Sequence, residues 1–214
     1  TAGLDFSVLG NEEKCCGDSL RRLGNEYVFH QLAMDNLRLF EKYGVTRILT
    51  HCPHCYTTLK NDYAQFGANY SVIHHTQFID QLVREGKIQL RKRVNGRTVV
   101  HDSCYLGRYN GIYEPPRNVL RAVSEGIPPL EMPRHEAKSF CCGAGGGRMW
   151  LEERAGKRIY LERTEEALAT RPSTIAVSCP YCMTMFEDGV KEIKAQDTVQ
   201  VRDIAEIVAE AIEA

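Results

Sequence analysis

The sequence predicts an α/β protein made of two similar lobes, and two observations carry this prediction. Short runs rich in β-branched residues alternate with segments of helical periodicity along most of the chain. The pattern Cys-Cys-Gly followed by Cys-Pro-x-Cys occurs twice, with Cys16 and Cys142 separated by 126 residues and Cys52 and Cys179 by 127. Strand followed by helix favours parallel sheets with helices on their faces. We therefore expect two Rossmann-like lobes with parallel sheets, derived from an internal duplication.

The individual elements follow from the local pattern. Apolar, β-branched runs predict strands over residues 6–9, 45–50, 70–73, 98–101, 175–178 and 199–201. Helical spacing of apolar residues predicts helices over 25–42, 56–65, 76–85, 116–124, 151–169, 183–195 and 202–213. The charged stretch 84–97 contains Gly86 and Gly96 and is the predicted lobe boundary. This gives a first repeat over residues 1–90 and a complete second repeat over 91–214.

Composition limits the classes of function. The chain has 214 residues with 43% hydrophobic content, enough for one large core or two small ones. Its 27 basic and 28 acidic residues nearly cancel, which argues against a nucleic-acid partner. No apolar run approaches the roughly 20 residues of a spanning helix. These features predict a soluble globular chain with no direct membrane insertion.

Nine cysteines form the most informative set of residues. The first group consists of Cys15, Cys16, Cys52 and Cys55, and the second of Cys104, Cys141, Cys142, Cys179 and Cys182. Secreted disulfide scaffolds are usually short, and an odd count would leave one thiol unpaired, so a reducing compartment and metal ligation are favoured. A redox dithiol remains an alternative.

The predicted scaffold places all nine cysteines at the carboxyl ends of parallel strands, where open α/β sheets bind ligands. Cys15, Cys52, Cys104, Cys141 and Cys179 are each expected just after a strand or the loop that follows it, while the other four lead into helices, two of which are expected to begin at Tyr56 and Met183. Helix amino termini favour an anionic cluster, and the glycine-rich run 143–147 supplies further N–H groups to its sulfurs. A closed zinc site needs four ligands, which the first group could supply. The five thiols of the second group favour a polynuclear cluster with a bridging thiolate.

The second group begins with Cys104, which follows the predicted strand 98–101, whereas the first group has no such cysteine. At the repeat offset, its counterpart would lie upstream of Thr1. We therefore expect the chain to be a fragment of a longer protein, with the amino-terminal part of the first repeat missing.

The doubled motif resembles the cysteine-rich CCG domain of heterodisulfide reductase subunits and of the iron-sulfur subunits of glycolate, lactate and anaerobic glycerol-3-phosphate dehydrogenases. The resemblance covers essentially the whole chain and is carried in detail by residues 72–78, 101–108 and 141–150. It implies one or two non-cubane [4Fe-4S] clusters, each held by five cysteines. The second cluster would use all five cysteines of the second group, and the first would lack its fifth ligand here, which leaves zinc possible at that site.

Residues 24–27 and 50–56 are most similar to the fused oxidoreductases linked to electron-transfer flavoprotein. This resemblance implies an electron-transfer domain of a quinone-linked or flavoprotein-linked oxidoreductase, not competent as an enzyme without the rest of its parent protein. The implied partners are a redox subunit and the upstream part of the same chain, in the cytoplasm or at the cytoplasmic face of a membrane. The alternatives are a disulfide-cleaving catalytic subunit of the heterodisulfide reductase type and a structural zinc-binding version of the fold. Catalytic residues are not assigned.

Several other side chains lie near the predicted strand ends or the second group. For the histidines His51, His54, His74, His75 and His101 we expect hydrogen bonding or packing in preference to metal ligation or proton relay. Arg108 and Arg148 flank the second group and are expected to be solvated ion-pair partners. Trp150, the single tryptophan, is expected to be a core anchor.

Overall fold

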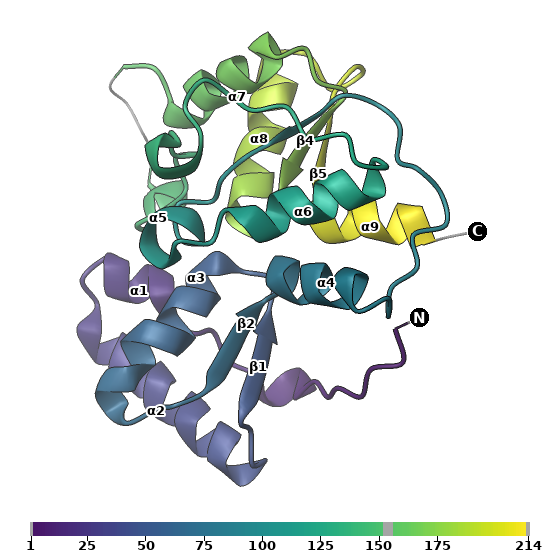
Figure 1. Cartoon of the computed structure of the whole chain (residues 1–214). Coiled ribbons are helices and arrows are strands. Elements are labelled where there is room, and N and C mark those ends of the chain that lie inside the picture. Colours follow the sequence, from purple (N-terminus) through teal and green to yellow (C-terminus); the bar gives the residue numbers. More distant parts are fainter. Residues whose placement is uncertain (1, 152–155, 213–214) are drawn as a thin grey trace.

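A computed structural model of the chain describes residues 2–151 and 156–212 and confirms the α/β class. Two separate parallel sheets are present (Figure 1). The first pairs β1 (Arg47–Thr50) with β2 (Ser71–His74). The second has the order β3-β4-β5 and consists of β3 (Thr98–Val100), β4 (Thr174–Val177) and β5 (Gln200–Asp203). The paired strands are joined by helical crossovers, as parallel pairing requires.

The helices around the first sheet are α1 (Asp18–Arg22), α2 (Glu26–Lys42), α3 (Pro53–Thr57) and α4 (His75–Arg84), with short turns η1 (Gly10–Glu12), η2 (Thr58–Asp62) and η3 (Tyr63–Phe66). Those around the second are α5 (Gly107–Asn110), α6 (Glu114–Val123), α7 (Ile159–Ala169), α8 (Pro180–Glu192) and α9 (Ile204–Ile212), with turns η4 (Glu136–Lys138) and η5 (Arg148–Trp150). The short helix α5 was not predicted, and the helix expected after Cys16 (α1) was predicted without a residue range. No helix in the described part of the chain is both long and apolar enough to cross a membrane.

Proline sets the start of the two helices that follow the Cys-Pro-x-Cys motifs. Pro53 and Pro180 occupy the first helical turn of α3 and α8, where a missing N–H costs no hydrogen bond and the fixed φ suits the helix. Both helices therefore begin three residues earlier than predicted, and the predicted starts at Tyr56 and Met183 are wrong. The predicted helix 56–65 is broken into α3, a π turn and a 3-10 turn that ends at Gly67, whose φ is +84°.

Most of the other predicted strands and helices match observed ones to within three residues at each end. One predicted strand is wrong, because residues 6–9 pair with no other strand and Phe6 and Val8 are 78% and 75% exposed. The helix predicted over 151–169 begins at Ile159, and residues 152–155 of that prediction lie outside the described residues. Trp150 is 64% exposed, so the expectation of a core anchor is also wrong.

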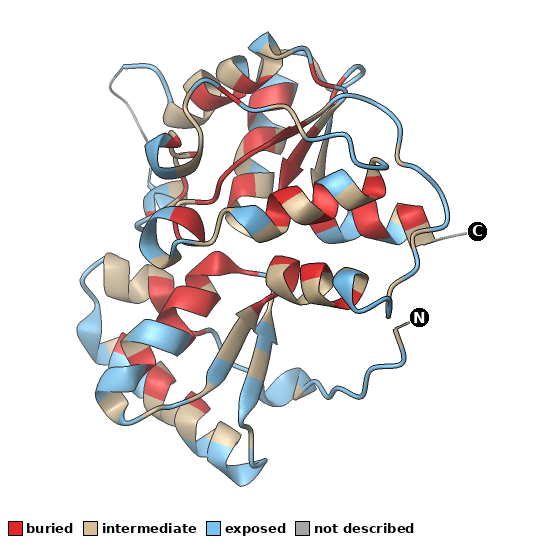
Figure 2. Ribbon diagram, in the orientation of Figure 1, coloured by how far each residue is buried: buried red, intermediate tan, exposed pale blue. Residues whose placement is uncertain are grey.

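Buried residues concentrate around the second sheet (Figure 2). One face of this sheet packs with α8, where Ile175 and Phe186 are buried, and the other packs with α6 and α9 through Val100 and Ile207. A smaller cluster around Phe29 packs α2 against η2 and η3 in the first half. The second sheet is thus covered on both faces, as expected for a parallel sheet.

The two halves meet where α4 lies against α6 and α9 (Figure 1). His75 Nε2 at the start of α4 lies 3.0 Å from Asp203 Oδ1 at the end of β5. The stretch predicted as the lobe boundary packs on the second half, because Ile88, Leu90 and Val94 contact the cluster beneath α6 and α9. The division at residue 90 stays a prediction.

Candidate metal centre

Each Cys-Pro-x-Cys motif links the carboxyl end of a strand to the first turn of a helix. Cys52 follows β1 and caps α3, and Cys179 follows β4 and caps α8. Cys55 and Cys182 lie in the first turns of these helices. The backbone N–H of Cys55 donates to the Cys52 thiol, so the positive end of the helix dipole faces the sulfur. The predicted placement of these four cysteines at strand ends is confirmed.

Each Cys-Cys-Gly motif forms a turn in which backbone N–H groups face the sulfurs. Gly17 N donates to Cys15 Sγ at 3.4 Å and Gly143 N donates to Cys141 Sγ at 3.3 Å. Both glycines have left-handed φ values, +86° for Gly17 and +95° for Gly143. This conformation is strained for a residue with a Cβ, which gives a physical reason for the third position of the motif.

The structure corrects the predicted placement of three cysteines. Cys15 and Cys141 follow irregular segments, since no strand precedes them directly. Cys142 leads into the glycine-rich loop and the short turn η5, whereas Cys16 is followed by α1 as predicted. Cys104 lies four residues beyond the end of β3, close to the strand end.

The nine thiols form one unbroken row of side-chain contacts. Along the row the order is Cys15, Cys16, Cys55, Cys52, Cys179, Cys182, Cys142, Cys141 and Cys104. Each neighbouring pair is within hydrogen-bonding reach. The two predicted groups are therefore internally connected, and a single contact between Cys52 and Cys179 joins them across the two halves.

The thiols in the middle of this row are more buried than those at its two ends. Cys16, Cys52, Cys142, Cys179 and Cys182 are buried, whereas Cys15 at one end is exposed. Cys55, Cys104 and Cys141 are intermediate, and all nine are free thiols. The contact between the two groups lies in the interior, and the first group opens to solvent at Cys15.

Hydrogen bonds between neighbouring thiols push their pKa values apart. Three thiols accept from two neighbours each, which holds their pKa below the usual range: Cys16, Cys52 and Cys141. The pKa of Cys52 is lowered to about 2, first by Cys179 and then by Cys55. The pKa of the other six thiols is raised, for Cys179 mainly by burial and for the rest mainly by a hydrogen bond to a neighbouring thiol. The thiolate is the form that ligates metals, and these hydrogen bonds favour that form at Cys16, Cys52 and Cys141.

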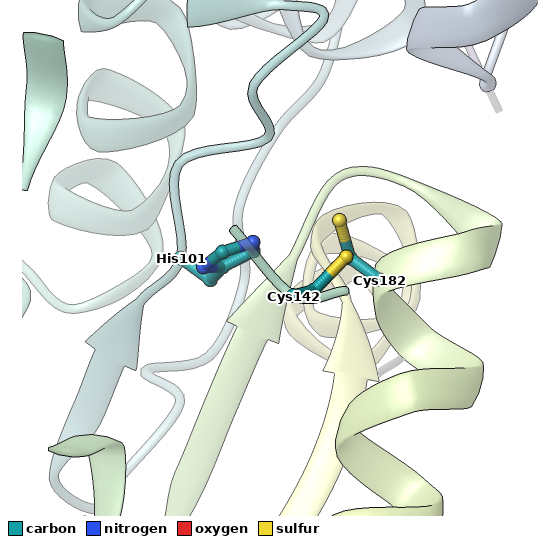
Figure 3. A group of neighbouring side chains, drawn as sticks. All are labelled: His101, Cys142 and Cys182. Carbon is teal, nitrogen blue, oxygen red and sulfur yellow. The ribbon is translucent and has the colours of Figure 1, made fainter. Parts of the chain in front are cut away.

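His101 is the histidine that lies directly against the thiols. One imidazole nitrogen and the Sγ atoms of Cys142 and Cys182 all lie within 4.8 Å of one another (Figure 3). The other side of the ring is fixed by Arg163, whose Nε donates to Nδ1 at 3.3 Å. Burial, followed by the charge of Arg163, lowers the pKa of His101 to about 3, so the imidazole is neutral. This group of three could hold a thiophilic metal ion, which no feature of the sequence specifically predicted.

Three of the other candidate histidines, His54, His74 and His75, form hydrogen bonds through their rings, in line with the expectation from sequence. His74 Nε2 lies 3.2 Å from the carbonyl of His51, and burial lowers the pKa of His74 to about 3. His54 Nδ1 lies 2.7 Å from Asp18 Oδ2, and both side chains are buried. The His54 ring stacks on Tyr105 at 4.1 Å between centroids.

Two charged residues that sequence analysis missed support the site. Asp18 follows the first Cys-Cys-Gly directly and binds Arg22 as well as His54, so its position beside the motif could have signalled it. Arg163 is fully buried in α7, and nothing in its sequence neighbourhood distinguishes it. Arg108, expected to be solvated, donates to the carbonyl of Ser139.

Gly143→Ala is expected to weaken the second cysteine group. A Cβ on Gly143 would lie 3.1 Å from Ile159 Cβ, and φ of +95° is unfavourable for alanine. We expect a loss of about 1–3 kcal/mol in the free energy of unfolding. Urea unfolding measures this loss. Gly146→Ala is the matched control, because φ is +69° there but a Cβ would meet nothing within 4 Å. Equal losses in the two variants would mean that φ alone matters.

The lowered pKa of Glu166 predicts how the free energy of unfolding changes at acidic pH. Burial alone would raise its pKa, but hydrogen bonds from Arg134 and Arg163 hold the pKa below its ordinary value. A lowered pKa stabilises the fold above the unfolded pKa, about 4.3, and this stabilisation is lost as pH falls through the folded pKa. In Glu166→Gln the free energy of unfolding should therefore depend less on pH below about 5 than in the parent chain. Glu165→Gln, an exposed neighbour, should keep the parent slope.

A family model described as the cysteine-rich CCG domain matches residues 1–60 and 98–187. The chain belongs to this family. Both Cys-Cys-Gly motifs and both Cys-Pro-x-Cys motifs fall within the matched residues. The predicted resemblance is confirmed.

Individual relatives are named as oxidoreductases. The chain is 48% identical to the EtfAB:quinone oxidoreductase of Syntrophomonas wolfei and 47% identical to the probable iron-sulfur-binding oxidoreductase FadF of Bacillus subtilis, in each case over 99% of this chain. It is 32% identical, over 98% of its length, to one subunit of the dihydromethanophenazine:CoB–CoM heterodisulfide reductase of Methanosarcina acetivorans. The chain spans 30% of each of the first two relatives and 52% of the third.

Proposed function

We propose that this CCG-family chain is an iron-sulfur electron-transfer domain of a larger oxidoreductase. The row of nine thiols in contact at the ends of two parallel sheets carries the proposal. The donors fit an iron-sulfur cluster, because soft thiolates are its usual ligands and backbone N–H groups already face the sulfurs. When bound, such a cluster would accept and release single electrons.

In this proposal Cys104, Cys141, Cys142, Cys179 and Cys182 hold one non-cubane [4Fe-4S] cluster. The first group would hold a second cluster, or zinc, through Cys15, Cys16, Cys52 and Cys55. His101 would orient the second group, since Arg163 fixes the ring from one side and the two sulfurs lie on the other. The buried contact between Cys52 and Cys179 would keep water out between the two groups.

The partners we propose are a flavoprotein or quinone-linked subunit and an upstream part of the same parent chain, in the cytoplasm or at the cytoplasmic face of a membrane. The name of the first relative, an EtfAB:quinone oxidoreductase, supports the flavoprotein- or quinone-linked partner, and the 30% share of the first two relatives that this chain spans supports a longer parent chain. A disulfide-cleaving role is the second candidate, supported by the heterodisulfide reductase relative. Reduction of an added disulfide by the reduced, metal-loaded protein would distinguish the second candidate from electron relay alone.

The metal content of Cys182→Ser tests the ligand assignment. In anaerobically reconstituted protein we expect this variant to lose about four irons and about four sulfides relative to the parent, together with the corresponding electron paramagnetic resonance signal. Ser103→Ala is the control, because Ser103 is equally buried beside Cys104 but its hydroxyl has no partner among the described residues. Zinc without sulfide in the parent protein would contradict the electron-transfer proposal and support a structural zinc domain.

A further inference from the structure

The thiols of Cys104 and Cys141 are in contact, although neither residue lies in a helix or a strand. Cys104 lies four residues beyond the end of β3, and Cys141 ends an irregular stretch that follows α6 and includes the short turn η4. By contrast, Cys179 and Cys182 are oriented by the first turn of α8. The contact between Cys104 and Cys141 therefore depends on side chains that hold the two irregular segments together.

Asp102, two residues before Cys104, joins the two segments. Its carboxylate oxygen Oδ2 accepts a hydrogen bond from the backbone N–H of Glu136 at 2.7 Å, and its carbonyl oxygen accepts one from Ser139 Oγ at 3.2 Å. Glu136 and Ser139 lie five and two residues before Cys141. Asp102 and Ser139 are both buried, so water does not compete for these bonds. One acidic residue thus ties the approach to Cys104 to the approach to Cys141.

Arg117 fastens this arrangement to α6, the helix in which it lies. Its Nη1 and Nη2 atoms donate to the two carboxylate oxygens of Asp102 at 2.7 and 2.9 Å. The same guanidinium donates to the two carboxylate oxygens of Glu131 at 2.8 and 2.9 Å and to the carbonyl of Tyr113 at 2.9 Å. All five N–H donors of the guanidinium are therefore used, which a lysine could not reproduce. Because Glu131 belongs to the stretch that leads to Cys141, α6 holds both segments.

We propose that Asp102 and Arg117 are positioning residues of the second cysteine group. They hold Cys104 against Cys141 by fastening to α6 the two irregular segments that carry these thiols. A buried ion pair often adds little net stability, because burying the charges costs free energy, so the effect of this pair is expected mainly on the geometry of the segments that it joins. The positions of the metal-free thiols depend on no bound metal. The consequence for a cluster rests on the proposed function.

The rate at which iodoacetamide labels each cysteine tests the proposal in the metal-free full chain. The rate depends on the exposure and ionisation of each thiol, and peptide mass spectrometry assigns it to individual cysteines. Asp102→Asn keeps the size of the side chain but removes its charge and turns an amide N–H2 toward a hydrogen-bond donor. We expect Cys104 and Cys141 to react at least about tenfold faster in this variant than in the parent chain, whereas Cys52 should keep its rate.

Ile207→Ala is the control for a general loss of stability. Ile207 is buried in α9, and its truncation should lower the urea midpoint without removing any bond of Asp102. Labelling of Cys104 and Cys141 should stay at the parent rate in this variant, measured well below its urea midpoint. Ser139→Ala is a milder second variant, because it removes the hydroxyl that binds the Asp102 carbonyl, and it should speed the labelling of Cys141 about threefold.

The outcomes separate the positioning role from the metal. Equal acceleration in Asp102→Asn and Ile207→Ala, or parent rates in both Asp102→Asn and Ser139→Ala, would overturn the proposal. After anaerobic reconstitution, Asp102→Asn should bind fewer irons than the parent and change the electron paramagnetic resonance signal, whereas Ile207→Ala should keep the parent signal. A parent signal in Asp102→Asn would overturn the role of the pair at the metal centre. Faster labelling in Asp102→Asn, with no iron bound by the parent, would support the positioning role and count against the proposed function.

Discussion

Arg163→Met should lower the free energy of unfolding by about 3–5 kcal/mol, because the variant leaves buried acceptors without their donor. The guanidinium is buried in α7 and donates to Glu166 Oε2 at 2.8 Å and to the carbonyl of Arg134 at 2.9 Å. It also donates to Ser139 Oγ and to His101 Nδ1. Methionine fills much of the volume but satisfies none of these groups. Chemical denaturation with two spectroscopic probes measures the loss.

The control for this variant is Arg171→Met, which removes an exposed guanidinium and should change the free energy of unfolding by less than about 0.5 kcal/mol. Arg163→Met should also release the His101 ring, so the second group should bind iron less completely than in the control. A loss of stability below about 1 kcal/mol would show that the network is replaceable by an apolar side chain.

Phe29→Ala should destabilise the chain by about 3–5 kcal/mol, the usual cost of removing a large buried aromatic ring. Phe29 is 0% exposed and packs against Tyr63 at 6.2 Å and Phe66 at 6.0 Å between ring centroids. A Cβ on Gly17 would lie 2.8 Å from the ring, so Phe29 also supports the first Cys-Cys-Gly turn. We expect faster amide exchange at Gly17 in this variant, measured together with thermal unfolding.

Tyr27→Ala serves as the matched control for Phe29→Ala, because Tyr27 is in the same helix but is 73% exposed. Its effect on stability should stay within about 0.5 kcal/mol. If Phe29→Ala lowered stability without changing exchange at Gly17, the turn would be held by its own backbone and not by the aromatic ring beneath it.

The local sequence pattern predicted strands correctly wherever the run of residues pairs with another strand. Every strand in the described part of the chain was predicted to within two residues at each end, because strands are short runs rich in β-branched residues. The run 6–9 has the same local pattern, but a strand also needs a neighbour with which to pair, and sequence pattern does not contain this information. The prediction that Trp150 anchors the core was wrong for a similar reason. The apolar character of a residue does not show whether another element covers its side chain.

The cysteines of the candidate site were identified from motif spacing alone. The contact that joins the two cysteine groups was not predicted. The contact between Cys52 and Cys179 depends on how the two halves pack together, through α4 against α6 and through the stacking of His54 on Tyr105, which motif spacing does not encode. The same holds for Arg163, whose partners are 24 or more residues away in sequence except for Glu166. Asp18 is different, because a carboxylate directly after Cys-Cys-Gly, with a histidine inside Cys-Pro-x-Cys, is a local signal that can be read.

A single contact, between Cys52 and Cys179, joins the two cysteine groups. The packing of the two halves against each other therefore affects the geometry of the site. Each sulfur group lies within its own half, so the two groups are held together by the packing of α4 on α6, by the stacking of His54 on Tyr105 and by the hydrogen bond between Ser19 and Tyr181. The surface on which the two halves pack, most of whose residues carry no thiol, therefore sets whether the nine sulfurs form one row or two separate groups.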